Sequence, residues 1–116
     1  MFKEAISGIR YALLADGKLI WFLMALIAIY MVNVFLAIDV NSSAITILCA
    51  GTVYSSEMFN TAIEHLCDRI TIQRDYDIKL VKDMSAGAVL FLCVTAVLVA
   101  MLVYIPKIVE IIVVKK

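Results

Sequence analysis

This chain of 116 residues has little of what bends a backbone or attracts a polyanion. It contains one proline, four glycines and one histidine, and its ten basic residues are balanced by ten acidic ones. The neutral balance argues against nucleic acid binding, which depends on a surplus of Lys and Arg that neutralises phosphates. The glycines are scattered, and neither GxxxxGK followed by Ser or Thr nor GxGxxG is present. A P-loop and a protein-kinase glycine loop are therefore excluded.

The cysteines are equally uninformative about chemistry. Cys49, Cys67 and Cys93 are separated by 18 and 26 residues, and no CxxC pair occurs. A disulfide framework or a cysteine-based zinc site is therefore not expected. Cys49 and Cys93 lie in apolar runs, where a thiol behaves as a small hydrophobic side chain.

Apolar sequence is what the chain has in abundance. Hydrophobic residues make up 65% and charged residues 17%, against about 45–50% and about 25% in typical globular domains. About 20 helical residues cross a bilayer core, and residues 19–38 and 86–105 are such runs. Residues 44–63 are long enough but include Glu57 and Asn60. We expect an all-α membrane protein in which residues 1–116 form one domain with three transmembrane helices.

The N-terminal residues 2–15 predict a helix of another kind. Apolar side chains recur along one stripe at helical spacing, namely Phe2, Ile6, Ile9 and Leu13. Lys3 and Arg10 lie on the other side, which predicts an amphipathic helix in the plane of the lipid headgroups. The alternative is a helix that packs on the protein's own loops, and both interpretations keep it on the same membrane surface.

The basic residues indicate the topology. Residues 1–18 contain three, residues 39–43 none, the polar segment 64–83 four and residues 107–116 three. With three spans, the N-terminus and the predicted loop 64–83 share a side that holds seven of the ten basic residues. The positive-inside rule makes that side cytoplasmic.

Polar residues beside the predicted spans are candidate helix caps. Asn41, Ser42 and Ser43 are expected to cap the second span, and Asp77 is expected to cap the third. Pro106 is expected to close the third span. The pattern does not decide whether the apolar residues 107–116 extend that span or lie on the surface.

A polar stripe follows the cytoplasmic end of the second span. Its members are spaced by three, four and four residues and fall within about 80° of arc on a helix: Glu57, Asn60, Glu64 and Asp68. An acid at the bilayer centre costs about 3 kcal/mol, so Glu57 should face the bundle interior or a cavity. A Glu57–Asn60 hydrogen bond that only fixes helix packing is the alternative. With no basic residue in the stripe, its three carboxylates predict a bound divalent cation or a raised pKa.

Magnesium fits this stripe best, because it accepts one or two carboxylates together with phosphate oxygens and water. Zinc would need His or Cys ligands, and His65 lies about 100° around the helix from Glu64. Lys82 and Asp83 precede the third span, where a lysine suits a nucleotide phosphate. A snorkelling lysine beside a helix-starting aspartate is the more common meaning of that pair.

The residues around the stripe resemble a family signature. The strings EMFNTAIEHLCDR at 57–69 and KDMSAGAV at 82–89 are similar to motifs of the small prokaryotic diacylglycerol kinase family, which includes the undecaprenol kinases. These motifs are E-x-x-N-S/T-A-I/V-E-x-x-x-D-R and A/V-K-D-x-x-A/S-A/G-A-V. The resemblance extends over nearly the whole chain. It implies a homotrimer in the bacterial cytoplasmic (inner) membrane, with active sites between subunits, that phosphorylates a lipid hydroxyl, of undecaprenol or diacylglycerol, with MgATP.

The resemblance also implies individual roles. Glu57 corresponds to the catalytic base that acts on the lipid hydroxyl, with Asn60 beside it, and Glu64 and Asp16 correspond to metal-binding acids. Ala86 matches the undecaprenol kinase branch, whereas the diacylglycerol branch tends to have Ser. Nucleotide contacts are implied for seven residues: Arg10, Asp68, Gln73, Arg74, Asp75, Lys82 and Asp83.

The chain departs from the family pattern at three places. Asp16 is one methylene shorter than the family's Glu, Ile20 stands where a basic residue is common, and Arg74-Asp75 replaces a Tyr-His pair. Two other functions stay open from the residues themselves. A transporter also uses an intramembrane carboxylate, but it predicts a fourth span. A non-catalytic assembly subunit would use the stripe only to join helices.

Overall fold

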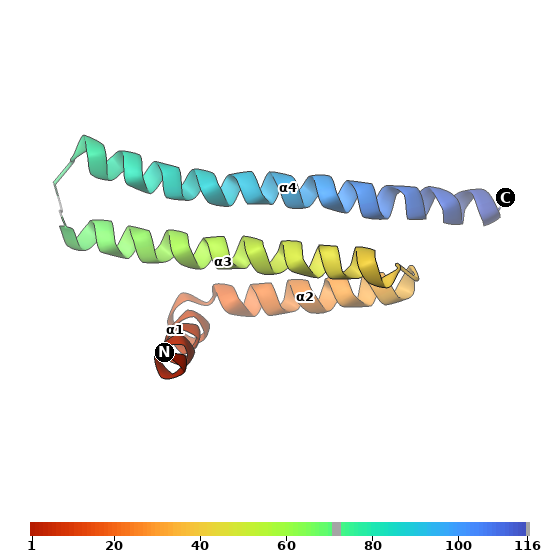
Figure 1. Cartoon of the computed structure of the whole chain (residues 1–116), viewed down its shortest axis with the longest axis horizontal. Helices are drawn as coiled ribbons and strands as arrows, with labels where there is room; N and C mark the ends of the chain where they lie inside the picture. Colours follow the sequence, from red (N-terminus) through yellow and green to blue (C-terminus); the bar gives the residue numbers. More distant parts are fainter. Residues whose placement is uncertain (71–72, 116) are drawn as a thin grey trace.

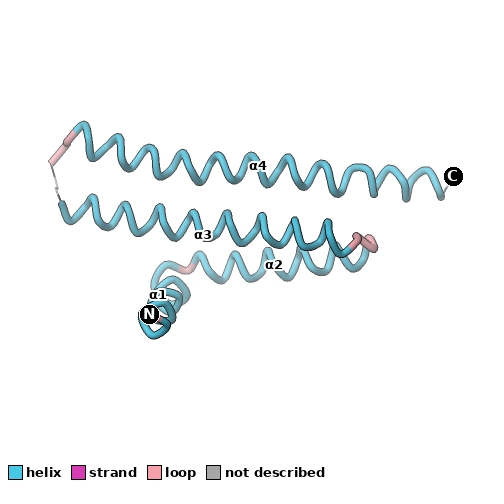
Figure 2. The backbone as a smooth tube through the Cα atoms, viewed as in Figure 1, coloured by secondary structure: helices cyan, strands magenta, loops and turns pink. Residues whose placement is uncertain are grey.

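Helices account for every regular element in the part of the chain that the computed structural model describes, residues 1–70 and 73–115 (Figure 2). The side chains of residues 15 and 16 are outside this description. The all-α prediction is confirmed for the described residues. The elements in order are α1 (Phe2–Tyr11), the π-helix η1 (Ala12–Asp16), α2 (Lys18–Phe35), α3 (Val40–Ile70) and α4 (Tyr76–Lys115).

The three long helices run side by side, with α3 packed against both α2 and α4 (Figure 1). α1 is seen nearly end-on in this view, so it runs across the direction of the long helices. The 40 residues of α4 extend about 60 Å at 1.5 Å per residue and set the 63 Å length of the molecule. The radius of gyration is 18.2 Å, well above the roughly 13 Å of a compact domain of this size.

Most apolar side chains of the described residues lie on the outside of this assembly. The buried ones are few: Ala12, Cys67 and Val89, with the polar Asn33 and Thr46. Phe91 and Leu102 of α4 are 76% and 77% exposed. Surface of this kind is stable only when lipid or another polypeptide covers it.

Two of the described helices are long and apolar enough to cross a membrane. α2 and α4 reach mean hydropathies of 2.0 and 2.8 over 18 residues. α3, predicted as the middle span, does not meet the same criterion, because its apolar part includes Glu57 and Asn60. The spans predicted at residues 19–38 and 86–105 are supported by composition, and a third remains a prediction.

The residue that caps the N-terminus of α3 is not one of those predicted. Asn41, Ser42 and Ser43 lie inside the first turn of α3, and the cap is Asp39, whose Oδ2 accepts a hydrogen bond from the Ser42 N–H at 3.0 Å. This bond lowers the pKa of Asp39, so the cap is retained until the pH falls through that lowered value. Ala37 adopts a left-handed φ of 54° and ends α2.

The prediction that residues 64–83 form a loop of about twenty residues is wrong. α3 continues to Ile70 and α4 begins at Tyr76, so both ends of the segment are helical. The segment contains charge but neither glycine nor proline, and polar residues alone do not interrupt a helix. The cap of α4 is Asp75 rather than Asp77, because Asp75 Oδ1 accepts a hydrogen bond from the Ile78 N–H at 3.1 Å.

Pro106 does not end the helix of the third predicted span, because α4 continues through this residue to Lys115. Proline removes one backbone donor, but helices in apolar surroundings continue past it when the remaining groups are satisfied. The undecided tail is therefore a helical extension of α4 as far as Lys115.

One polar network joins all three long helices at the end of the molecule opposite α1. Asn33 of α2 is 4% exposed, and its Nδ2 donates to Thr46 Oγ1 of α3 at 3.1 Å. The hydroxyl of Tyr104 in α4 donates to Asn33 Oδ1 at 2.6 Å. Because buried amides need partners, this network fixes the relative positions of α2, α3 and α4.

We predict that Tyr104→Phe destabilises the folded protein by about 1 kcal/mol, since it removes one interhelical hydrogen bond and leaves Asn33 Oδ1 without its donor. The measurement is the unfolding midpoint in detergent micelles titrated with SDS. Tyr30→Phe is the matched control, because Tyr30 is 61% exposed. Equal midpoints for the two variants would contradict the role of the network.

Candidate active site

The predicted polar stripe lies on one continuous helix. Glu57, Asn60, Glu64 and Asp68 all belong to α3, whose C-terminal half lies at the same end of the molecule as α1 (Figure 1). Asn60 Nδ2 donates to Glu64 Oε1 at 3.3 Å, so the hydrogen bond seen for Asn60 goes to Glu64 and not to Glu57. Asn60 Oδ1 is buried and has no hydrogen-bond partner in the described structure.

Glu57 lines a groove of about 540 Å³ between α2 and α3. This position agrees with the expectation that a charged side chain in a predicted span faces a cavity and not lipid. Aromatic and small apolar side chains form most of the lining, with Tyr54 on α3, Trp21 and Phe22 on α2, and Ala96 on α4. The rings of Phe22 and Tyr54 stack at 4.5 Å between centroids. An acid at one place in an apolar groove suits a molecule with one polar end.

The ammonium of Lys18 lies 3.5 Å from Glu57 Oε2. Lys18 is the first residue of α2, and it also donates to Thr61 Oγ1 at 3.4 Å. No local sequence pattern predicts this contact, because 39 positions separate Lys18 from Glu57 and only the packing of α2 against α3 brings them together.

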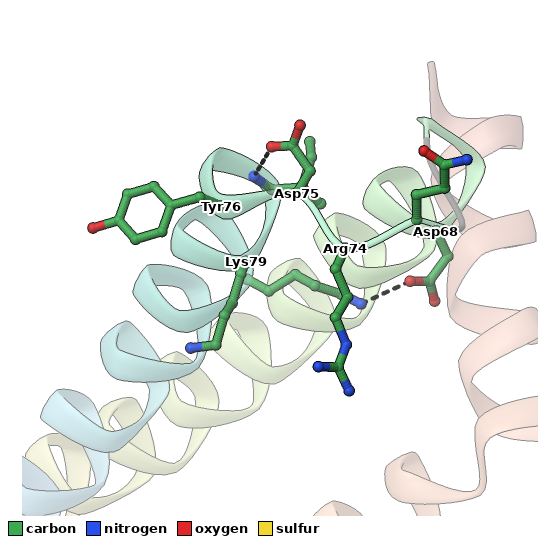
Figure 3. A pocket seen from close by; sticks show the side chains of 8 residues that line it. Asp68, Arg74, Asp75, Tyr76 and Lys79 are labelled. Carbon is green, nitrogen blue, oxygen red and sulfur yellow. Dashed lines mark hydrogen bonds and ion pairs between the residues drawn. The ribbon is translucent and has the colours of Figure 1, made fainter.

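A second pocket of about 690 Å³ lies where α3 ends and α4 begins (Figure 3). It brings together five of the predicted nucleotide-binding residues: Asp68, Gln73, Arg74, Asp75 and Lys82. The side chains of Arg74 and Lys79 extend on the same side of the connection as Asp68 in Figure 3, whereas Asp75 turns back to cap α4. The pocket therefore presents several cations to one space.

The remaining predicted nucleotide residues lie outside this lining. Asp83 Oδ2 accepts a hydrogen bond from Lys79 Nζ at 2.6 Å, and this ion pair lies within one turn of α4. Arg10 is exposed in the last turn of α1 and does not line the pocket. Ala86 is exposed on α4, one turn beyond Lys82.

Lys82 and Asp68 join α4 to α3 across this pocket. Lys82 Nζ lies 2.7 Å from Asp68 Oδ1, and Lys82 precedes the apolar residues 86–105. The hydrogen bond to Asp68, supported by the charges of Asp68 and nearby Glu64, raises the pKa of Lys82 above its ordinary value. Lys82 is therefore cationic at neutral pH and suited to a phosphate.

Each carboxylate of the stripe has its own polar partner, and these partners were not predicted from the sequence. Glu57 pairs with Lys18, Glu64 with Asn60 and Asp68 with Lys82. Two of these partners come from neighbouring helices and could not be found by inspecting α3 alone.

The donors near Glu64 fit a hard cation better than zinc. Among the side chains that the structure describes, no three of the types His, Cys, Asp and Glu are grouped closely enough to hold a metal. Glu64 and the unpartnered Asn60 Oδ1 are oxygen donors, which Mg²⁺ accepts alongside phosphate oxygens and water. The side chain of Asp16, the other predicted metal ligand, lies outside the described residues. His65 contacts the ring of Tyr11 edge-on, with 6.4 Å between centroids.

α1 and η1 cover the same end of the molecule. Tyr11 and Ala12 face Met58, Thr61 and His65 of α3 across a cleft of about 420 Å³. On its other side α1 leaves apolar residues uncovered, including Phe2 at 78% exposure. The arrangement agrees with a helix that lies on a membrane surface beside the polar stripe.

Comparisons with known proteins add a family match. Residues 3–104 match the profile of the family described as prokaryotic diacylglycerol kinase. The chain is also 40% identical over 63 residues to the undecaprenol kinase of Bacillus subtilis (strain 168). This alignment covers 54% of the present chain and 51% of that relative, so it spans about half the length of the curated relative.

The Asp68–Lys82 pair predicts a specific pH dependence. Because the pKa of Lys82 is raised in the folded state, the pair stabilises the protein fully below the unfolded-state lysine pKa of about 10.4. The contribution is lost as the pH rises through the folded-state value. Wild type should therefore have a higher unfolding midpoint than Lys82→Met from pH 7 to 9, and the difference should shrink above about pH 10.4.

Lys115→Met, in the last turn of α4, is the matched control for the loss of one charge. A wild-type advantage over Lys82→Met that stays constant up to pH 11.5, or one equalled by the control, would rule out the ion pair as its source.

Proposed function

Since the chain belongs to the prokaryotic diacylglycerol kinase family, we propose that it is a MgATP-dependent lipid kinase. It transfers the γ-phosphoryl group of ATP to a lipid hydroxyl at the cytoplasmic membrane surface and releases ADP. The observation that carries this proposal is the order of groups along α3, from Glu57 in an apolar groove through Glu64 to Asp68 beside a cationic pocket. That order runs from lipid towards water.

Glu57 is the proposed general base. Phosphoryl transfer depends on in-line positioning and charge neutralisation, and a base that takes the proton of the attacking hydroxyl contributes about 10²–10⁴-fold. A lipid whose chain lies in the groove would present its hydroxyl to the one carboxylate in the lining. Asn60, one turn further along α3, is proposed to assist at the same point.

The pocket between α3 and α4 is the proposed nucleotide site. Arg74, Lys79 and Lys82 supply positive charge there, and Lys82 keeps its charge at neutral pH. Eleven residues of helix, about 16 Å, separate Asp68 from Glu57, so the triphosphate has to extend along α3 towards the groove. Asp83 is proposed to act indirectly, by holding Lys79 at 2.6 Å.

Glu64 is the residue that would hold Mg²⁺, with Asp16 as the second acid and Asn60 Oδ1 as a further oxygen donor. When bound, the metal neutralises charge on the transferred phosphoryl group. Glu64 lies between the proposed base and the nucleotide pocket on α3, which is where the terminal phosphates would pass.

Undecaprenol is the proposed lipid, with diacylglycerol as the second candidate. Ala86 matches the undecaprenol branch of the family, and the similar protein of Bacillus subtilis is named an undecaprenol kinase. We further propose that three copies assemble in the cytoplasmic membrane, with the N-terminus and residues 73–75 on the cytoplasmic side, and that Arg10 on α1 approaches the nucleotide in this assembly. The exposed apolar faces of α2 and α4 supply surface for such contacts.

The other two functions have less support. A transporter predicts four spans, and two of the described helices are apolar enough for one. A stripe that only joins helices would not explain why several cationic side chains line one pocket beside Asp68.

We expect Glu57→Gln to lower kcat for lipid phosphorylation by at least about 10²-fold, with the KM for ATP nearly unchanged, because Glu57 lies outside the nucleotide pocket. ADP release with undecaprenol or diacylglycerol in mixed micelles measures both constants and also identifies the preferred lipid. Glu110→Gln, near the far end of α4, is the matched control and should retain activity. A fully active Glu57→Gln protein would refute the assignment of the base.

Glu64→Gln should raise the Mg²⁺ concentration for half-maximal activity by about tenfold or more, or abolish turnover, because Mg²⁺ loses a charged ligand. The protein should still be folded in detergent, as judged by helical circular dichroism. Glu4→Gln, on α1, serves as the control. A normal magnesium titration of Glu64→Gln would exclude the metal role.

A further inference from the structure

The position of Lys18 is set by a tight turn. η1 is followed by Gly17, which has a left-handed φ of 73° and donates its N–H to the carbonyl of Ala12 at 3.2 Å. α2 begins directly afterwards. Glycine adopts such a φ without the steric cost of a Cβ atom, and this turn fixes where the first residue of α2 projects.

Lys18 uses this position to reach two residues one turn apart on α3. Its Nζ lies 3.5 Å from Glu57 Oε2 and 3.4 Å from Thr61 Oγ1. The lysine and glutamate side chains are 47% and 34% exposed, and ion pairs of such exposure add little to folding stability. Stability alone is therefore a weak reason for this contact.

We propose that Lys18 is a positioning residue for the base Glu57, an inference that rests on the proposed lipid kinase activity. The ammonium holds Oε2, which leaves Oε1 as the carboxylate oxygen for the lipid hydroxyl. Thr61 accepts a hydrogen bond from the same ammonium, so Lys18 of α2 is held by two residues of α3. Asn60 gives its amide to Glu64, so Lys18 is the polar partner that the structure assigns to Glu57.

The geometry also connects the surface helix to the reaction. α1 and η1 lead into the Gly17 turn, and α2 begins with the residue that contacts Glu57. A displacement of η1 on the membrane surface would move Lys18 relative to the base. Misplacement by about 1 Å can cost on the order of 10²-fold in rate.

The test compares Lys18→Met, Lys18→Arg and the control Lys107→Met, which breaks another Lys–Glu pair, with Glu110 at 3.9 Å. Lys18→Met should lower kcat about tenfold, with the KM for ATP changed less than about twofold, since only the orientation of the base is lost. Lys18→Arg should restore kcat to within about threefold of wild type, because a cation again contacts the carboxylate. Lys107→Met should match wild type.

A double-mutant cycle separates positioning from a general effect. In the Glu57→Gln background, measured with radiolabelled ATP at high enzyme concentration, Lys18→Met should cause no further loss, because there is no carboxylate left to orient. The same fold-change in both backgrounds, or a wild-type rate for Lys18→Met, would overturn the proposal. An inactive wild-type protein would instead refute the lipid kinase activity itself.

A cross-linking measurement tests the contact without reference to activity or to a variant that could misfold. A water-soluble carbodiimide activates a carboxylate and joins it to an amine in direct contact. Mass spectrometry of the digested wild-type protein should detect an amide between Lys18 and Glu57. Its absence, with the Lys82–Asp68 amide formed as a positive control, would overturn the proposed contact.

Discussion

A carboxylate in an apolar surrounding needs a partner, because its charge is costly where water is scarce. α3 is the long helix that has to meet this cost, since it carries Glu57, Glu64 and Asp68 on one stripe. It lies between α2 and α4, and each neighbour contributes a lysine: Lys18 from the start of α2 and Lys82 from the start of α4. Each long neighbour of α3 therefore supplies one cationic partner to the stripe.

The polar side chains at the two ends of the three long helices are paired in different ways. At the end away from α1, Asn33 makes neutral hydrogen bonds to α3 and α4 and is buried, so the helices are fixed there. At the α1 end the pairs are ionic and partly exposed, and two pockets open beside them. A rigid end and an accessible end are what a membrane enzyme needs when one substrate arrives from the bilayer and the other from water.

Local sequence pattern was sufficient for the helices and for the stripe, since both depend on residues close together in the chain. The amphipathic helix and the shared face of Glu57 and Asp68 follow from periodicity, and the runs at 19–38 and 86–105 follow from hydropathy. The failures concern the ends of the helices and their tertiary contacts. The segment 64–83 looked like a loop because it is charged, but its charges pair across α3 and α4, as Asp68 and Lys82 do.

The predictions of the helix caps and of the partner of Glu57 failed because both depend on where helices begin and how they pack. Ser and Asp residues near Asp39 and Asp75 have a similar ability to cap a helix. Which of them is the cap depends on the residue at which the helix begins. The cationic pocket was partly anticipated, because the family resemblance implied nucleotide contacts for Gln73, Arg74 and Asp75. Lys18 was missed as a partner of Glu57, since no local pattern relates two positions on different helices.

The apolar exterior links fold and function. Phe91, Leu102 and many other exposed apolar residues need to be covered by lipid or another polypeptide, and such a cover would reduce the access of water to the surface around them. In that surrounding, charges on the proposed base and on a transferred phosphoryl group would interact more strongly than they do in water. The same surface that holds the protein in the membrane thereby contributes to the proposed chemistry.

Transfer of a phosphoryl group from ATP to a lipid is the reaction proposed for this chain. It can be followed with the purified protein, Mg²⁺, undecaprenol or diacylglycerol, and ATP labelled in parallel reactions at the γ- or the α-phosphate. Label should enter the lipid from γ-labelled ATP alone, with one ADP formed for each lipid phosphate. Folded protein that leaves both lipids unlabelled, or lipid that acquires label from the α-phosphate, would contradict it.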